Sequence, residues 1–144
     1  MSHDPSIRLA TVADAAELAR LISPLGYPTT ADAVAALWGA WAAEGNFALV
    51  VDGETSLVGT ITLHRMHVLH RPKPVGRITA LAVDPQERGQ GLGRALVLAA
   101  EDALVGSGCG LVEVTSHARR TVAHDFYRHL RYEQTSVRFA KVFT

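Results

Sequence analysis

The sequence predicts an α/β protein, with a mixed sheet of about six strands flanked by four helices in the order β-α-α-β-β-β-α-β-α-β. Residues 77–83 predict a strand whose apolar run begins at Ile78 and ends at Asp84-Pro85, and a glycine-rich turn then leads into a helical pattern from Leu92. A second strand pattern, at residues 110–115, follows that helix and predicts a right-handed parallel crossover with the two strands side by side or one apart. Upstream, two apolar runs flank Asp52-Gly53, as in an antiparallel hairpin.

Composition narrows the classes of function. At 144 residues the chain is long enough for one domain with a buried core. Lys+Arg and Asp+Glu both number 14, so the net charge attracts neither nucleic acid nor an anionic membrane, and we expect neither partner. Cys109 is the single cysteine, which excludes an internal disulfide and favours a reducing compartment. With no signal-peptide or membrane-span pattern, the expected location is the cytoplasm.

The N-terminal third predicts a strand and two helices. Residues 7–10 alternate as a short strand does, and Thr11 with Asp14 three residues later resembles the capping box that begins a helix. Pro24 ends this helix, and a second helix is predicted to run to about Gly45. The apolar positions that define the second helix are Val34, Leu37, Trp38 and Trp41. Its two tryptophans, three residues apart, are more typical of core packing than of substrate binding.

Three histidines, His64, His67 and His70, follow the hairpin strands at residues 47–51 and 56–63. On an extended chain, residues three apart point to opposite faces, whereas a zinc site needs three or four ligands in compact geometry. We therefore expect no metal site. That one of the three histidines faces a pocket stays an alternative.

The turn at residues 88–94 predicts a phosphate cradle. Gly89, Gly91 and Gly93 let the backbone adopt positive φ and approach a ligand closely. Free N–H groups at the following helix start, together with Arg88 and Arg94, favour a phosphate. The spacing matches neither the P-loop, which needs Lys-Ser/Thr after its last glycine, nor the dinucleotide G-x-G-x-x-G motif.

The C-terminal part completes the predicted order. After the strand at residues 110–115, residues 116–120 connect to a helix at about residues 121–130. Residues 135–143 then predict a final strand, with Val137, Phe139 and Lys141 on one face.

Arg88-Gly89-Gln90-Gly91-Leu92-Gly93 resembles the Q/R-x-x-G-x-G/A motif of the GNAT superfamily of N-acetyltransferases. The resemblance implies a GNAT-like fold, residues 1–144 as a single N-acetyltransferase domain, and acetyl-CoA as cosubstrate, with no metal. In such enzymes the pyrophosphate binds the loop amides and the pantetheine lies along the preceding strand as a pseudo-strand. The residues expected to bind the cosubstrate are Leu81, Ala82, Val83, Arg88, Gly89, Gln90, Gly91, Leu92, Gly93, Arg94 and Arg120.

A second motif lies one helix and one strand downstream. Residues 123–132, beginning Ala123-His124-Asp125-Phe126-Tyr127, resemble the A-x-x-F-Y-x-x-L-G-Y/F signature of the same superfamily. The family usually carries glycine where Arg131 stands, so we expect a non-glycine residue in the left-handed region to end this helix.

The resemblance makes Tyr127 the candidate catalytic general acid. When an amine attacks the thioester, the leaving thiolate has a pKa near 8 to 9, and a phenol of pKa about 10 stays protonated at neutral pH and can donate to it. The alternative for Tyr127 is an aromatic residue packed on the sheet with its hydroxyl merely satisfied.

The general base is not determined by the sequence. Some relatives place a glutamate at the start of the strand before the glycine loop, where this chain has Arg77. The remaining candidates are Thr79, His64, His67 and Glu113, and an ordered water would need none of them.

The expected function is acetyl transfer from acetyl-CoA to a primary amine of a small molecule or protein by direct attack on the thioester. A non-catalytic acyl-CoA-binding or regulatory module and an ATP-binding domain of another class are the alternatives. The resemblance also implies that the first helices line the acceptor pocket. Homodimers are common in this family, and we expect one here in which the apolar residues from Val137 to Phe143 contribute to the contact.

Overall fold

The computed structural model describes residues 6–115 and 121–143. Within them a single sheet holds five strands in the order β1-β2-β3-β4-β5. β1 to β4 pair in antiparallel fashion, and β5 pairs in parallel with β4, as the crossover prediction requires. The strand bounds are β1 Ile7–Leu9, β2 Asn46–Asp52, β3 Leu57–Met66, β4 Val75–Val83 and β5 Leu111–Val114. The predicted mixed α/β class is thereby confirmed.

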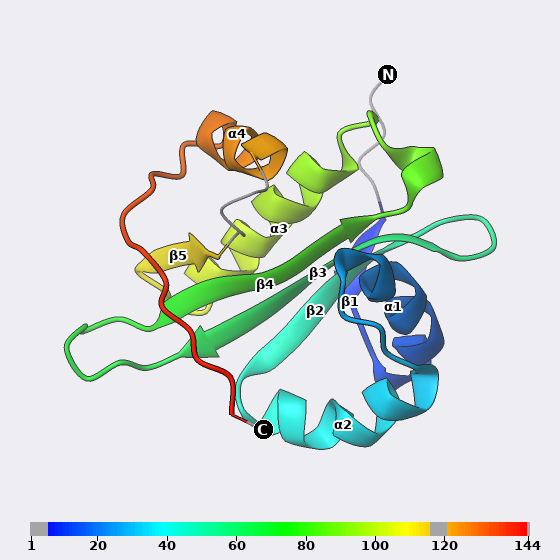
Figure 1. Ribbon diagram of the computed structural model, residues 1–144, viewed down its shortest axis with the longest axis horizontal. Coiled ribbons are helices and arrows are strands. Elements are labelled where there is room, and N and C mark those ends of the chain that lie inside the picture. Colours follow the sequence, from blue (N-terminus) through cyan, green and yellow to red (C-terminus); the bar gives the residue numbers. More distant parts are fainter. Residues whose placement is uncertain (1–5, 116–120, 144) are drawn as a thin grey trace.

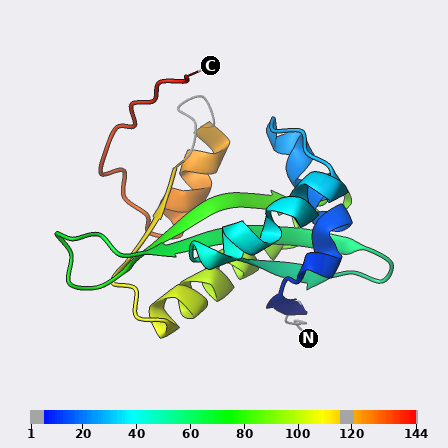
Figure 2. The same ribbon diagram turned by 90° about the horizontal axis from the view of Figure 1, so that it is seen from below.

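Four α-helices in the described part of the chain cover the sheet (Figures 1 and 2). They are α1 Ala15–Ile22, α2 Ala31–Ala43, α3 Leu92–Gly106 and α4 Thr121–His129, with short 3-10 turns η1 Val12–Asp14, η2 Ser23–Leu25 and η3 Pro85–Glu87. α3 packs its fully buried Leu96 and Leu104 on one face of the sheet, and α4 joins that cluster. α1 and α2 cover the other face, where Trp38 and Trp41 pack on the core as predicted.

The close fit of α3 to the sheet depends on a small residue in β4. A Cβ built on Gly76 would lie 2.7 Å from a methyl group of Leu104, closer than real side chains approach. Glycine at this position therefore lets the helix approach the sheet closely enough to bury Leu104 completely.

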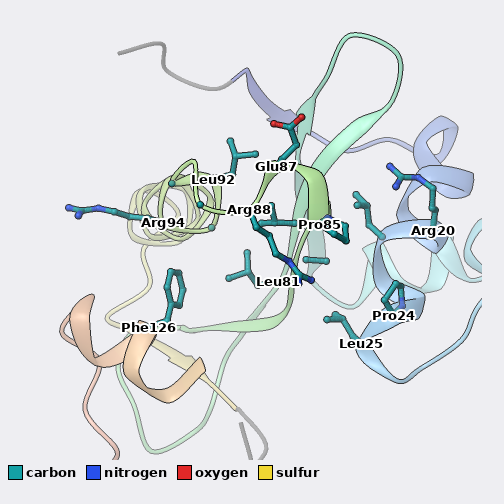
Figure 3. Close-up of a pocket in the computed structure, with 16 residues that line it drawn as sticks. Arg20, Pro24, Leu25, Leu81, Pro85, Glu87, Arg88, Leu92, Arg94 and Phe126 are labelled. Carbon is teal, nitrogen blue, oxygen red and sulfur yellow. The ribbon is translucent and has the colours of Figure 1, made fainter. Parts of the chain in front are cut away.

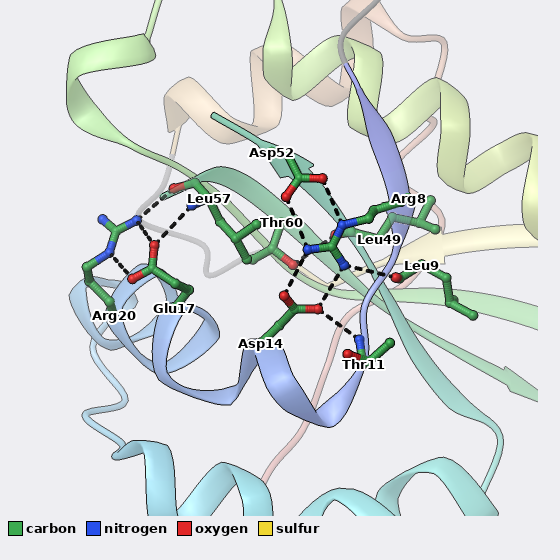
Figure 4. A network of polar contacts seen from close by, with 10 residues as sticks. All are labelled: Arg8, Leu9, Thr11, Asp14, Glu17, Arg20, Leu49, Asp52, Leu57 and Thr60. Carbon is green, nitrogen blue, oxygen red and sulfur yellow. Dashed lines mark hydrogen bonds and ion pairs between the residues drawn. The ribbon is translucent and has the colours of Figure 1, made fainter. Parts of the chain in front are cut away.

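Polar contacts fix the start of α1 (Figure 4). Arg8 donates to Asp14 at 2.9 Å and to Asp52 at 2.8 Å, which joins β1, η1 and the end of β2. Asp14 also accepts from the Thr11 backbone N–H at 2.8 Å, as the predicted capping box requires. The Arg8 hydrogen bond holds the pKa of the Asp14 carboxyl below its usual value, and the two carboxylates raise the pKa of Arg8.

The predicted sixth strand is wrong. Residues 135–143 carry no strand, because they hydrogen-bond to no neighbouring strand among the described residues. Figure 2 shows this segment running away from the sheet. Its large apolar side chains are exposed, with Val137 at 74%, Phe139 at 92% and Phe143 at 82%. An isolated segment has no ladder to satisfy its backbone, so alternation alone did not produce a strand.

Arg131 ends α4 in the left-handed conformation, with φ at 70°, which confirms the expectation for this position. The Tyr132 N–H donates to the Tyr127 carbonyl at 3.0 Å, and the Arg131 N–H donates to the Arg128 carbonyl at 2.9 Å. These two bonds form a Schellman motif, which usually has glycine at the position of Arg131.

We expect Arg131→Gly to raise the free energy of unfolding by about 0.5–1 kcal/mol, because relief of the left-handed strain exceeds the entropy cost of glycine. Thermal and urea unfolding measure the change. Arg128→Gly, inside the same helix, is the control and should lower stability by about 1 kcal/mol. Equal losses in both variants would show that Arg131 is not strained.

Candidate active site

β4 has a free edge beside the glycine turn. Its pairing with β5 ends at Ile78↔Val114, whereas its pairing with β3 continues to Val83. The register with β3 shifts so that Thr62 faces Ala80 and Leu63 faces Ile78, which leaves Thr79 as the extra residue of a bulge. The β5-facing edge of residues 79–83 therefore has no strand partner among the described residues. An extended ligand can pair with such an edge.

The glycine turn provides conformational freedom and open space. Asp84 is the N-cap of η3, and its side chain accepts from the Gln86 N–H at 3.0 Å. Gly89 and Gly91 then adopt φ values of +84° and +77°, and a Cβ on either would meet no atom within 4 Å. Glycine is thus required here by the backbone conformation, and the space above the turn remains open to a ligand.

The start of α3 leaves its first amides available. Gly91 is the N-cap and offers no side chain, and the first helical bond runs from the Ala95 N–H to the Gly91 carbonyl at 3.0 Å. Within the described chain, the N–H groups of residues 92–94 donate to no acceptor, and no acidic residue lies in the first turn. Such a helix start favours an anion.

A cavity of about 660 Å³ joins the free edge of β4 to the glycine turn (Figure 3). Nine of the residues predicted to bind the cosubstrate line it: Leu81, Ala82, Val83, Arg88, Gly89, Gly91, Leu92, Gly93 and Arg94. Gln90 and Tyr127 are not among the lining residues, and Arg120 lies outside the described residues.

The two arginines of the turn differ in direction. Figure 3 shows the Arg88 side chain reaching across the cavity, whereas the Arg94 guanidinium points away from it. Neither guanidinium donates a hydrogen bond within the described chain, although the charge of Arg88 helps to lower the pKa of Asp84. Arg88 is therefore the cation available to a ligand in the cavity.

Three apolar residues that were not predicted to bind the cosubstrate form further walls of the cavity. Pro24 and Leu25 belong to η2, which directly follows α1, and Phe126 of α4 lies on the opposite side of Leu81 (Figure 3). The Phe126 ring lies 3.6 Å from a Cβ built on Gly93, so it packs against the first turn of α3. The F-Y pair of the downstream motif is the sequence signal for Phe126, although the resemblance assigns a role only to Tyr127.

Arg20, a further lining residue, holds the site together. Its guanidinium donates to Glu17 at 3.1 Å, to Asp84 at 3.2 Å and to the Leu57 carbonyl at 2.7 Å (Figure 4 shows the Glu17 and Leu57 contacts). The Arg20 bond lowers the pKa of Glu17, while the Asp84 pKa is lowered first by the Gln86 N–H and then by Arg20. Because its donors are used in this way, Arg20 anchors α1 to the turn after β4.

Tyr127 lies in an aromatic cluster between α3 and α4. Its ring meets Phe126 edge-on at 5.1 Å between centroids, and Tyr132 at 5.7 Å. The Tyr132 hydroxyl donates to Glu101 of α3 at 2.7 Å. Burial, and secondarily the bond to Glu101, raises the pKa of Tyr132. The cluster fixes the position of Tyr127, and its role as general acid stays a prediction.

Three of the four candidate bases lie on strands of the sheet, and His67 follows the end of β3. Thr79 shares a 2.6 Å hydrogen bond with Thr62, and His64 donates from Nε2 to the Glu44 carbonyl at 3.0 Å. Arg77 pairs with Glu113 at 2.6 Å, and His67 is exposed. Across residues 6–115 and 121–143, no three His, Cys, Asp or Glu side chains gather as metal ligands would.

Comparisons with known proteins agree with this geometry. An aminoalkylphosphonate N-acetyltransferase of Salmonella typhimurium is 38% identical over 85 residues, which are 59% of this chain and 55% of that protein. An aminoglycoside N(6')-acetyltransferase of Stenotrophomonas maltophilia is 35% identical over 135 residues, covering 91% of this chain and 88% of that enzyme. A Trypanosoma brucei acetyltransferase structure superposes with a TM-score of 0.84 at 23% identity, over 97% of this chain and 100% of that one.

The sequence profile of the acetyltransferase (GNAT) family matches residues 13–132, a span that contains the free edge of β4, the glycine turn and the start of α4 through Tyr132. The chain belongs to the GNAT family of acetyltransferases.

Proposed function

We propose that the protein transfers an acetyl group from acetyl-CoA to a primary amine of a small molecule. The observation that carries this proposal is the continuity of the β4 edge with the open helix start. Residues 79–83 offer unpaired backbone groups, and the cavity beside them leads directly to the free amides of residues 92–94.

The residues present fit acetyl-CoA. Polar groups along the β4 edge suit the amides of an extended pantetheine, which would pair there as a pseudo-strand. The helix start and Arg88 suit the pyrophosphate, and Leu25, Leu81 and Phe126 supply apolar walls. The thioester of the bound cosubstrate supplies the acetyl group, and Tyr127 is our candidate donor of a proton to the departing thiolate.

The acceptor class is inferred from relatives. The two enzymes described above are named for aminoalkylphosphonates and for aminoglycosides, both of which are small amines. We therefore expect a small-molecule amine rather than a protein.

Calorimetry with acetyl-CoA and with ATP, followed by an assay of free thiol release with a panel of amines, tests the function. We expect acetyl-CoA to bind and amine-dependent thiol release to follow. Acetyl-CoA binding without transfer would instead identify a non-catalytic acyl-CoA module, and ATP binding without CoA binding would contradict the whole proposal.

Arg88→Ala should raise the acetyl-CoA Kd by about tenfold, because a charge-assisted bond to a phosphate is lost. Arg94→Ala is the matched control. Its guanidinium points away from the cavity, so we expect less than about a threefold change. Calorimetry measures both, and a larger effect of Arg94→Ala would reverse this assignment.

Tyr127→Phe should lower kcat by about 10²-fold while the acetyl-CoA Kd stays nearly constant, because only the donated proton is lost. Tyr132→Phe is the control: it removes the hydrogen bond to Glu101 and should lower stability by about 1 kcal/mol without a comparable loss of kcat. An unchanged kcat in Tyr127→Phe would exclude Tyr127 as the acid.

We also infer a homodimer in the cytoplasm. The exposed apolar segment at residues 135–143 has strand-like alternation and, in one copy, no strand beside it among the described residues. The outer edge of β5 likewise has no described partner strand, so a second copy offers a complementary edge. The free thiol of Cys109 is compatible with a reducing compartment.

Light scattering should give a mass twice the 15.4 kDa of one chain. Phe139→Asp should shift the protein to the single-chain mass, because it places a charge in the apolar contact. Leu69→Asp, an equally exposed site in the loop between β3 and β4, should leave the dimer intact. A wild-type mass of one chain would rule out the inferred dimer.

A further inference from the structure

A row of polar side chains crosses the sheet just before β4 and β5 separate. His64 of β3 is the register partner of Arg77 in β4, and Arg77 is the register partner of Glu113 in β5. Their sequence neighbours Leu63, Ile78, Val112 and Val114 pack in the cluster on the α3 side. Because side chains alternate along a strand, the polar row faces the opposite side of the sheet.

This part of the sheet is open. On this face, α1 covers only the C-terminal half of β4, where Ala82 is buried. By contrast, the side chains of Arg77 and Glu113 are 42% and 38% exposed. His64 donates to the Glu44 carbonyl just after α2 ends, so the helical cover stops at this row.

The ion pair leaves one group of each sign available. Nε and Nη2 of Arg77 both donate to the same oxygen, Oε1 of Glu113, at 2.9 and 2.6 Å. Oε2 of Glu113 and Nη1 of Arg77 form no hydrogen bond within the described chain. The carboxylate is therefore held in place while it still has an oxygen for a ligand.

The pair also lies next to the free edge along which the pantetheine is proposed to lie. Ile78↔Val114, the next register pair, is the last before the strands separate, and the Thr79 bulge follows at once. An amine held at Glu113 would thus approach from the open face of the sheet, beside the start of the free edge.

We propose that Arg77 and Glu113 recognise the acceptor, with Glu113 Oε2 binding its ammonium and Arg77 Nη1 binding an anionic group on the same molecule. The acceptor class is a small zwitterionic amine such as an aminoalkylphosphonate. This inference rests on the proposed acetyl transfer and specifies its acceptor.

The charges of the row favour a zwitterion over a polycation. Glu113 is the one carboxylate of the row, and Arg77 already neutralises its charge. A ligand with several ammonium groups would place one of them against the Arg77 guanidinium, whereas a zwitterion pairs both of its charges with opposite ones.

A purely structural cross-strand pair is the competing explanation, because exposed ion pairs of this kind commonly form between neighbouring strands. The two explanations differ in what they predict for KM. If the pair is only structural, removing either residue changes stability and leaves KM unchanged. If the pair recognises the acceptor, removing either residue raises KM for those acceptors that carry the charge which that residue binds.

The experiment compares 2-aminoethylphosphonate, ethylamine and an aminoglycoside in the thiol-release assay. Wild-type enzyme should prefer the phosphonate by at least about tenfold in kcat/KM. Glu113→Gln should raise KM for both the phosphonate and ethylamine by about tenfold or more. Arg77→Gln should lower kcat/KM for the phosphonate by about tenfold and for ethylamine by less than about threefold.

Asp52→Asn is the matched control, because it removes a carboxylate of similar exposure from the Arg8 ion pair at the other side of the sheet. Asp52→Asn should leave kcat/KM for all three amines unchanged. Calorimetry should show that every variant binds acetyl-CoA with the wild-type Kd. If the wild-type protein does not bind acetyl-CoA, the proposed function itself is refuted. With acetyl-CoA bound, transfer to none of the amines would contradict the proposed transfer and this inference together. Two results overturn only this inference: a wild-type preference for the aminoglycoside, or equal effects of Arg77→Gln on phosphonate and ethylamine.

Discussion

The separation of β4 from β5 after Ile78 is the constraint on which the candidate site depends. A parallel pair of strands normally satisfies its backbone groups along its whole length. Here the bulge at Thr79 redirects β4 while it stays paired with β3, and β5 ends at Val114. The resulting edge is unpaired over residues 79–83. It is nevertheless not an outer edge of the sheet, because β5 still pairs with the first half of β4. A partly enclosed edge accepts one extended molecule rather than a second sheet.

The remaining parts of the site depend on where that edge ends. Asp84 stops the strand, and Arg20 holds Asp84 against α1, so the glycine turn begins from a fixed point. Gly91 then begins α3 without a side-chain cap, and the buried Leu96 and Leu104 fix the axis of the helix on the sheet. The free amides at the helix start consequently lie at one end of the same cavity as the strand edge. Neither feature alone would distinguish a long CoA-like ligand from a simple phosphate.

The features set by local sequence were predictable, and those set by register were not. The glycine turn, the parallel crossover and the left-handed Arg131 follow from residue types at fixed spacings. The direction of Arg94 and the inclusion of Phe126 depend on how α3 and α4 pack, which no spacing specifies. The prediction of a sixth strand was wrong because alternation indicates which face of a segment can be buried. It does not indicate whether a partner strand is available.

The row of His64, Arg77 and Glu113 also required the register, and it changes the meaning of Arg77. In the sequence alone this arginine only displaces the glutamate that some relatives carry at the start of the same strand. In the fold it holds a carboxylate on the neighbouring strand, 2.6 Å away, so an acid is still present beside the free edge. In this chain the carboxylate lies on β5 and is paired with a cation on β4. In the proposed acceptor site, an amine bound to Glu113 also meets Arg77, so only an acceptor with a negative group of its own gains from both contacts.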